Sequence, residues 1–211
     1  WKAPVKILAV KPQKLNEIEK NFLQFDQNIP QNSLLISLLA GVPLQKLQIT
    51  FQGHLCVRAV PNTPVVVKKG LTGLAWGEDI SVKQRLLVKE IFNPISEVFE
   101  FPEDQLDGFL ALTSSGPAYV ALMIEALADG AVAAGLPRSI AHYLSHRTLY
   151  GTSLLLKEKD MQPSELKDMV TSPGGTTIKA LRHLEMAGLR SALIEAVVLA
   201  AERSREIGLN N

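Results

Sequence analysis

The chain has 211 residues, of which 46% are hydrophobic and 20% charged, a balance that is typical of a globular protein and excludes intrinsic disorder. The formal net charge is +1, Lys and Arg are scattered, and only 6% of residues are aromatic, which excludes a basic nucleic-acid-binding surface. The single cysteine, Cys56, excludes an intrachain disulfide and fits a reducing, cytoplasmic compartment. Cys56 lies in a strand-like run, which favours a small buried hydrophobe over a nucleophile.

The first half of the chain alternates between two hydrophobic patterns. Short apolar, β-branched runs predict strands over 5–10, 33–40, 54–60, 71–75 and 97–101. Helical spacing predicts helices over 15–22, 42–47 and 81–91. Strands that alternate with helices indicate a parallel sheet covered by helices.

The pattern changes at Pro102, beyond which only helical periodicity is found. It predicts helices over 106–112, 118–136, 139–156, 164–170 and 177–207, with Gly208 ending the last one. We therefore expect an α/β region followed by an all-α region. The expected domains are residues 1–102 and 103–211.

Residues 117–136 are almost wholly apolar over the length of a membrane helix. Glu125 and Asp129 lie near the centre of this stretch, and acidic side chains are costly in lipid. A helix that is apolar nearly all round is otherwise buried on several sides. We expect no membrane span here, and burial against a second subunit instead.

Three successive strand ends carry turn-forming and polar residues. They read Ala9-Val10-Lys11-Pro12-Gln13, Ser37-Leu38-Leu39-Ala40-Gly41 and Val60-Pro61-Asn62-Thr63-Pro64. Ligands of α/β proteins bind where parallel strands end. An ordinary turn explains any one of these segments, whereas three in succession favour a ligand cleft.

The most informative segment is Ser172-Pro173-Gly174-Gly175-Thr176-Thr177, between two helical stretches. We expect Pro173 to end the first helix and Thr176 or Thr177 to cap the second. Glycines, hydroxyl groups and backbone N–H donors at a helix N-terminus suit a small carboxylate. The alternative is a plain connector between helices with a threonine cap.

Other chemistries have no sequence signature here. The chain has no Gly-x-Ser-x-Gly, Gly-x-Gly-x-x-Gly or Walker sequence, and its four histidines lack the spacing of a metal site. We expect no metal centre.

Four segments, in order and at family-like spacing, resemble those of the pyrroline-5-carboxylate reductases. They are Ala9 to Gln13, Arg58 to Pro64, Ser115-Gly116-Pro117-Ala118-Tyr119 and Ser172 to Thr177, and the resemblance runs from about Val5 to Leu209. It implies a partial Rossmann-type domain, then a helical domain that dimerises by intertwining with a second subunit. Dimers of this family often assemble further into decamers.

The resemblance implies reduction of 1-pyrroline-5-carboxylate to L-proline by hydride transfer from NADPH or NADH. Thr177 would be catalytic, at the ring nitrogen of the substrate. The substrate-binding residues would be Ser172, Gly174, Gly175, Thr176, Thr177 and Asp160. The cofactor-binding residues would be Ala9, Val10, Lys11, Pro12, Pro61, Asn62 and Thr63. Asp160 would lie near the substrate turn, where pairing with Lys11 and simple solvation are equal alternatives.

The family's glycine-rich cofactor loop is missing from the sequence, and the chain begins with Trp1. We therefore expect an N-terminally shortened form that is inactive by itself. Two other interpretations stay open: a non-catalytic dimerisation or regulatory protein, and a different dinucleotide-dependent enzyme such as a 3-hydroxyacid dehydrogenase. The latter enzymes usually use a lysine on the long interdomain helix, and 115–129 contains none.

Overall fold

The structure is a computed structural model that describes residues 1–24, 30 and 32–209. By packing, the chain divides into two compact units, each described by itself below. The first, the α/β unit, comprises Trp1–Gly116 and Val197–Asn211, and the second, the helical unit, comprises Pro117–Ala196.

The α/β unit is built on a five-stranded sheet in the order β1-β2-β3-β4-β5. The strands are β1 (Val5–Leu8), β2 (Ser33–Ser37), β3 (His54–Pro61), β4 (Gly70–Trp76) and β5 (Ser96–Glu100). All neighbouring pairs are parallel except β3 and β4, which are antiparallel. The expectation of a wholly parallel sheet was wrong at this pair. Only residues 62–69, with the short 3-10 helix η3 (Thr63–Val67), join the two strands, and a parallel crossover needs a dozen or more residues.

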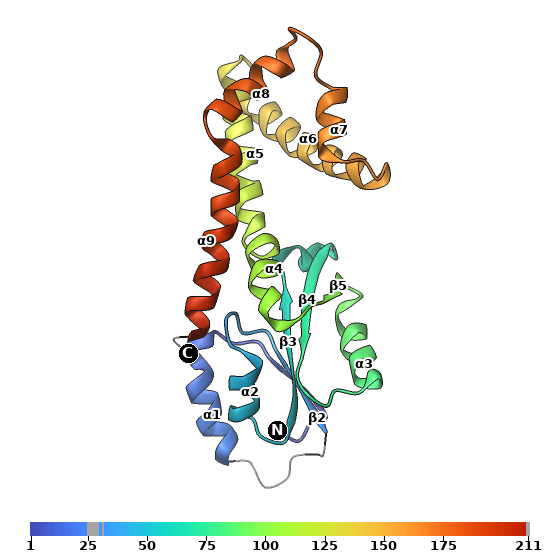
Figure 1. Cartoon of the computed structure of the whole chain (residues 1–211), viewed down its shortest axis with the longest axis vertical. Coiled ribbons are helices and arrows are strands. Elements are labelled where there is room, and N and C mark those ends of the chain that lie inside the picture. The colour runs from blue at the N-terminus through green and yellow to red at the C-terminus, as the bar shows by residue number, and fades with distance from the viewer. Residues whose placement is uncertain (25–29, 31, 210–211) are drawn as a thin grey trace. The chain divides into compact units, whose positions relative to one another are not determined.

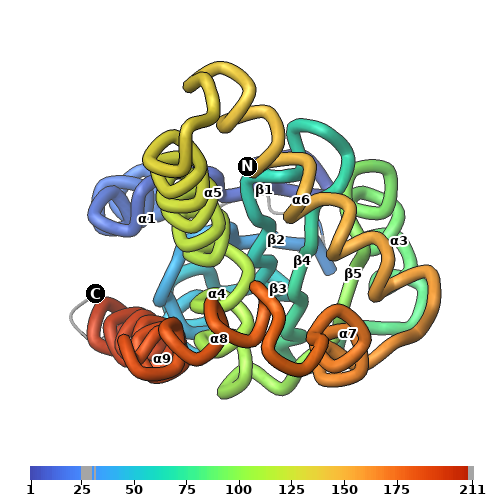
Figure 2. Tube along the Cα trace, turned by 90° about the horizontal axis from the view of Figure 1, so that it is seen from above, coloured from blue at the N-terminus to red at the C-terminus, as the bar shows by residue number. Residues whose placement is uncertain are grey.

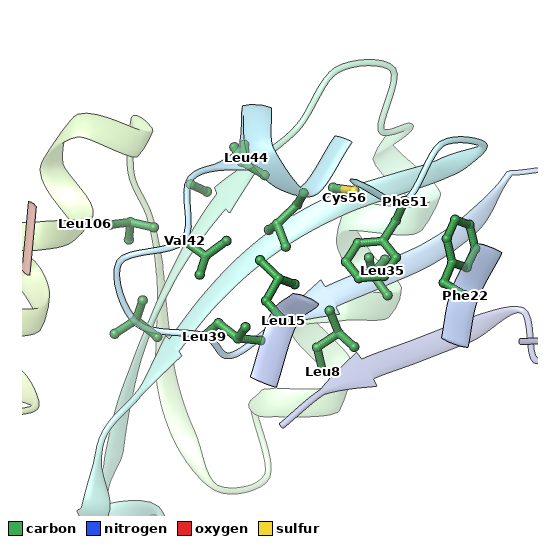
Figure 3. Close-up of a cluster of buried hydrophobic side chains, with 13 residues drawn as sticks. Leu8, Leu15, Phe22, Leu35, Leu39, Val42, Leu44, Phe51, Cys56 and Leu106 are labelled. Carbon is green, nitrogen blue, oxygen red and sulfur yellow. The ribbon is translucent and has the colours of Figure 1, made fainter. Parts of the chain in front are cut away.

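Helices cover both faces of the sheet (Figures 1 and 2). On one face, α1 (Leu15–Gln24), which follows the 3-10 helix η1 (Pro12–Lys14), and α2 (Leu44–Thr50) pack over a core that includes Leu35, Phe51 and Cys56 (Figure 3). On the other face, α3 (Val82–Phe92) packs over a second core. Every residue of β2 is buried, which explains its unbroken apolar run.

Segments from beyond Pro102 complete this unit. The 3-10 helix η4 (Glu103–Gln105) and α4 (Leu106–Thr113) lie in it, and Leu106 belongs to the first core. The last turns of α9 (Leu189–Leu209) belong to it as well, and Ser204 Oγ donates to Asp107 Oδ1 over 2.6 Å.

The sequence predicted that Gly208 ends the last helix. The structure instead places Gly208 inside α9, one residue before its end. A β-carbon at Gly208 would stand 2.2 Å from the carbonyl oxygen of Gly41. The glycine therefore permits a close approach of helix and loop that no other residue allows.

The helical unit contains α5 (Gly116–Ala133) from Pro117 onward, α6 (Arg138–Glu158), α7 (Pro163–Met169), α8 (Thr176–Met186) and the first part of α9. The single helix expected over 177–207 is two helices. Gly188 separates them with φ of +76°, the left-handed conformation in which glycine commonly ends helices.

The helical unit buries almost nothing by itself. Within 117–196, all of which the structure describes, the buried residues are Ala128, Ala141 and Ser145. Large apolar side chains are instead exposed on its helices, among them Leu122 and Tyr143, at 67% and 65%. A groove of about 400 Å³ runs along α8 and α9, lined by Lys167, Leu181, Leu184, Glu185, Leu189, Arg190, Leu193 and Ile194. This unit lacks the core that a separate domain needs.

The chain divides at different residues by secondary structure and by packing. The change from strands to helices falls between Glu100 and Glu103, near the expected boundary at Pro102. Packing, however, assigns 103–116 and 197–211 to the α/β unit. Domains over 1–102 and 103–211 stay a prediction.

Candidate functional site

The strand ends expected to border a cofactor lie at one edge of the sheet. Strands β1, β2 and β3 run parallel and end at Leu8, Ser37 and Pro61, so that the residues after them emerge at the same edge. Ala9, Val10, Lys11 and Thr63 are exposed there, and Pro12 and Pro61 are half-buried. This edge is where α/β folds bind their ligands.

Asn62 differs from its neighbours at this edge because its side chain is already engaged. It is 7% exposed. Its Nδ2 donates to the Thr113 carbonyl over 2.9 Å, and its Oδ1 accepts from the Leu71 N–H over 2.8 Å. The interpretation of Asn62 as a direct cofactor ligand is therefore less well supported than that of the exposed residues beside it.

The turn from Ser172 to Thr177 is open to a ligand. Gly174 has φ of +70°, a conformation that side chains rarely adopt, and Gly175 is the N-cap of α8 with no side-chain cap hydrogen bond. The Gly175 N–H donates to the Ser172 carbonyl over 3.1 Å, and Ser172 is exposed. With no side-chain cap, the first-turn N–H groups of α8 face the surroundings as donors for an anion.

Two details of this turn differ from the sequence-based expectation. No threonine caps α8; Thr176 and Thr177 are instead its first two residues. Pro173 does not end the preceding helix either, because α7 ends at Met169. The missing threonine cap leaves the first-turn amides of α8 without a side-chain acceptor.

Ser172 owes its position at the turn to the absence of a side chain at Gly175. A β-carbon at Gly175 would stand 2.4 Å from Ser172 Oγ and 3.2 Å from the Ser172 carbonyl oxygen. The glycine leaves space for this hydroxyl beside the helix start. The turn therefore combines a hydroxyl group and backbone amides around one point, the donor set that a carboxylate needs.

Asp160 precedes α7, whereas this turn follows it. It is exposed, follows the end of α6, and has φ of +47°. The whole of α7 lies between it and Ser172, as Figure 1 shows. A role for Asp160 in substrate binding gains no support from the helical unit.

An ion pair that the sequence did not reveal lies at the start of the helical half. Arg58, 4% exposed on β3, donates through Nη1 to Glu103 Oε1 over 2.8 Å. The same oxygen accepts from the Leu44 N–H over 2.6 Å, at the first residue of α2. Since Pro43 provides no side-chain cap, Glu103 caps α2 across a long sequence separation. The sequence did contain one signal, an arginine within an apolar strand. It contained nothing that identifies Glu103 as the partner of this arginine.

Cys56 is 1% exposed, and burial raises the pKa of its thiol to about 12. The interpretation as a buried hydrophobe is confirmed, because a thiol with such a pKa forms little thiolate. Among the described residues no group of three or more His, Cys, Asp or Glu side chains is placed to hold a metal ion.

The chain has a parallel-strand edge suited to a dinucleotide and, further along, a helical region with a turn that can bind an anion. These features are typical of two-domain dinucleotide-dependent oxidoreductases. Residues 103–207 match the sequence model of pyrroline-5-carboxylate reductase dimerisation. The pyrroline-5-carboxylate reductase of Synechocystis sp. is 49% identical over 204 residues, 97% of this chain and 75% of that protein. The enzyme of Glycine max is 38% identical, over 96% of this chain and 73% of its own.

A solved structure agrees with these relatives. The Plasmodium falciparum pyrroline carboxylate reductase with NADP bound superposes with a TM-score of 0.87 at 31% identity, covering 98% of this chain and 78% of that one. The chain belongs to the pyrroline-5-carboxylate reductase family. The expected family and fold class are confirmed, and the dinucleotide-dependent alternative such as a 3-hydroxyacid dehydrogenase is set aside.

The family match also explains the exposed apolar helices. Residues 103–207 carry the dimerisation domain of the family, so the chain forms a homodimer through its helical half. The exposed apolar side chains of 117–196 are consistent with a surface that a dimerisation domain buries.

Proposed function

We propose that the full-length protein reduces 1-pyrroline-5-carboxylate to L-proline with NADPH or NADH, the last step of proline biosynthesis. The observation that carries the proposal is the uncapped start of α8 beside Ser172, in a chain that belongs to this family. A substrate with one carboxylate on the ring carbon beside its imine nitrogen fits a site of hydroxyl and amide donors. The balanced reaction takes up one hydride and one proton and leaves a secondary amine.

The turn binds and orients the substrate. The Ser172 hydroxyl and the N–H groups of Thr176 and Thr177 hold the carboxylate. The Thr177 hydroxyl, half-buried at the second residue of α8, hydrogen-bonds the ring nitrogen and keeps its proton in place. A threonine hydroxyl is too weak an acid to be the proton source, so water or prior protonation in solution supplies the proton. Orientation of the ring is the main contribution of these residues to the rate.

The strand edge fits the nicotinamide and ribose part of the cofactor. Ala9, Val10 and Lys11 are exposed at that edge, with Thr63 emerging from the same side of the sheet. When bound, the reduced nicotinamide supplies the hydride that the imine carbon accepts. Lys11 offers a cation to the anionic cofactor, and the adjoining Pro12 and Pro61 form rigid, apolar walls. The Plasmodium falciparum pyrroline carboxylate reductase has this fold and has NADP bound, which supports this assignment of the cofactor site.

We also propose that the protein works in the cytoplasm, without a membrane, and that its dimers assemble further, up to a decamer. By length and composition alone, one helical stretch, Glu103–Ala133, is apolar enough to cross a membrane. Within it Asp129 forms an ion pair with Arg138, which favours a protein or water environment. Light scattering of the purified protein tests the assembly: a mass no larger than one dimer, or one that is not a multiple of the dimer, contradicts it.

The activity is tested directly with the full-length protein. We expect the near-ultraviolet absorbance of NADPH or NADH to fall only when 1-pyrroline-5-carboxylate is added, with proline formed in equal amount. A folded dimer that forms no proline with either cofactor contradicts the proposal and favours the non-catalytic, regulatory alternative.

Replacing Ser172 by alanine is expected to raise the Michaelis constant for 1-pyrroline-5-carboxylate by about tenfold, the effect of losing one hydrogen bond to a charged group. Gly175→Ala should also raise this Michaelis constant. Its β-carbon would stand 2.4 Å from Ser172 Oγ and would displace that hydroxyl group. Steady-state kinetics measure both effects. An unchanged Michaelis constant in Ser172→Ala contradicts the role of its hydroxyl.

A further inference from the structure

The hydrogen bond from Asn62 ends on a carbonyl group that has lost its usual donor. In a continuing helix, the Thr113 carbonyl accepts from the N–H four residues later. That residue is Pro117, which has no N–H. Helix α5 starts at Gly116, directly after the Ser114–Ser115 pair that follows α4. The Asn62 Nδ2, at 2.9 Å, supplies the donor that Pro117 lacks.

Asn62 also holds the strand end itself. Its Oδ1 accepts from the Leu71 N–H, and its own N–H donates to the Leu71 carbonyl over 3.2 Å. Its carbonyl accepts from the Val65 N–H at the start of η3, also over 3.2 Å. One buried residue thus joins the end of β3, the start of β4, η3 and the last residue of α4.

A second anchor stands four residues earlier on β3. Arg58 and Asn62 point to the same face, since side chains alternate along a strand. Arg58 bonds Glu103 at the start of η4, and Asn62 bonds Thr113 at the end of α4. Strand β3 and the residue that follows it therefore hold the segment 103–113 at both ends, each time through a buried side chain.

We propose that Asn62 is a positioning residue for the reduction, an inference that rests on the proposed function. Its amide fixes the strand end Pro61–Thr63 by bonding the carbonyl that Pro117 leaves without a donor, and it does not bind the cofactor through that amide. The segment Pro61–Pro64 and the end of α4 at Thr113 then form one structural unit, although they are far apart in the sequence.

The test is Asn62→Asp, a change of the same shape, in the full-length protein. The new carboxyl group still accepts from the Leu71 N–H, but when ionised it places an oxygen against the Thr113 carbonyl. When protonated it donates to that carbonyl again, and burial raises the pKa of such a group. The proposal therefore predicts a loss of turnover that acid reverses.

We expect kcat of Asn62→Asp to fall by about tenfold or more near pH 8, because small displacements at a reacting site are costly. The Michaelis constant for the cofactor should stay within about threefold, since no direct bond to the cofactor is lost. Relative to the natural protein at each pH, kcat should recover by about threefold or more near pH 5.5, as the carboxyl group becomes protonated. Asn62→Ala should lose turnover without any such recovery.

A matched control separates positioning from stability. Ser96→Ala breaks another buried hydrogen bond, to Thr72 Oγ1 at 2.7 Å, and should lower the melting temperature with kcat unchanged. If Asn62→Asp does not fold near pH 8, Asn62→Ala, which buries no charge, carries the kinetic comparison.

Several results overturn the inference. An unchanged kcat in the folded variants does so, as does recovery of Asn62→Ala to the same extent as Asn62→Asp. A raised cofactor Michaelis constant with unchanged kcat assigns Asn62 to direct cofactor binding instead. A natural protein without turnover refutes the proposed function and this role together, whereas an active natural protein with unaffected variants refutes only this role.

Discussion

Thr177→Ala is expected to lower kcat by about 10²-fold, the effect of removing one hydrogen-bonding group aimed at the reacting atoms. Thr177 is the second residue of α8, directly after the proposed carboxylate site at the helix start. Alanine is the best helix former, so the helix itself should persist. Steady-state kinetics with saturating substrate and cofactor measure the loss, and circular dichroism checks the fold.

Two variants serve as controls for Thr177→Ala. Thr177→Ser keeps the hydroxyl group and should recover most of the turnover. Thr152→Ala makes the same chemical change at an exposed position of α6 and should leave kcat as it is. If Thr177→Ala turns over as fast as the natural protein, the hydroxyl has no part in the reaction.

Glu103→Ala is expected to lower the free energy of unfolding by about 2–4 kcal/mol, because it leaves the buried Arg58 guanidinium without its partner. The value is set below that of a fully buried pair because the Glu103 side chain is 32% exposed. The start of α2 also loses its cap at the Leu44 N–H. Denaturant unfolding, followed by circular dichroism, measures the change.

Glu103→Gln separates the charge from the hydrogen bonds. The amide oxygen still accepts from Arg58 and from the Leu44 N–H, so this variant should lose clearly less stability than Glu103→Ala. Equal losses in the two variants would show that the charge dominates. A loss below about 0.5 kcal/mol in Glu103→Ala, the range of ordinary surface changes, would contradict a structural role for the pair.

Most of the fold follows from hydrophobic spacing along the chain. The strands of the sheet are where their apolar runs predict them, and α3 nearly matches its predicted range. The antiparallel pairing of β3 with β4 was missed because spacing shows where strands are, not their direction. The break at Gly188 was missed because the apolar pattern continues across it.

The candidate site was predictable in part. The turn at Ser172–Thr177 and the strand ends are local in sequence, so their residue types and spacing are enough to name them. The engagement of Asn62 with Thr113 and the pairing of Arg58 with Glu103 join positions far apart in the chain. Contacts of this kind depend on how helices pack over the sheet, which no local pattern contains.

The close contact of Gly41 with Gly208 has a consequence for how the protein is made. The α/β unit takes its last helical turns from residues after Val197, whereas its sheet is complete by Glu100. On the ribosome the sheet therefore emerges long before the helix that packs beside Gly41. We therefore expect α9 to join this unit after the sheet has formed, and a side chain at position 208 to hinder that last step.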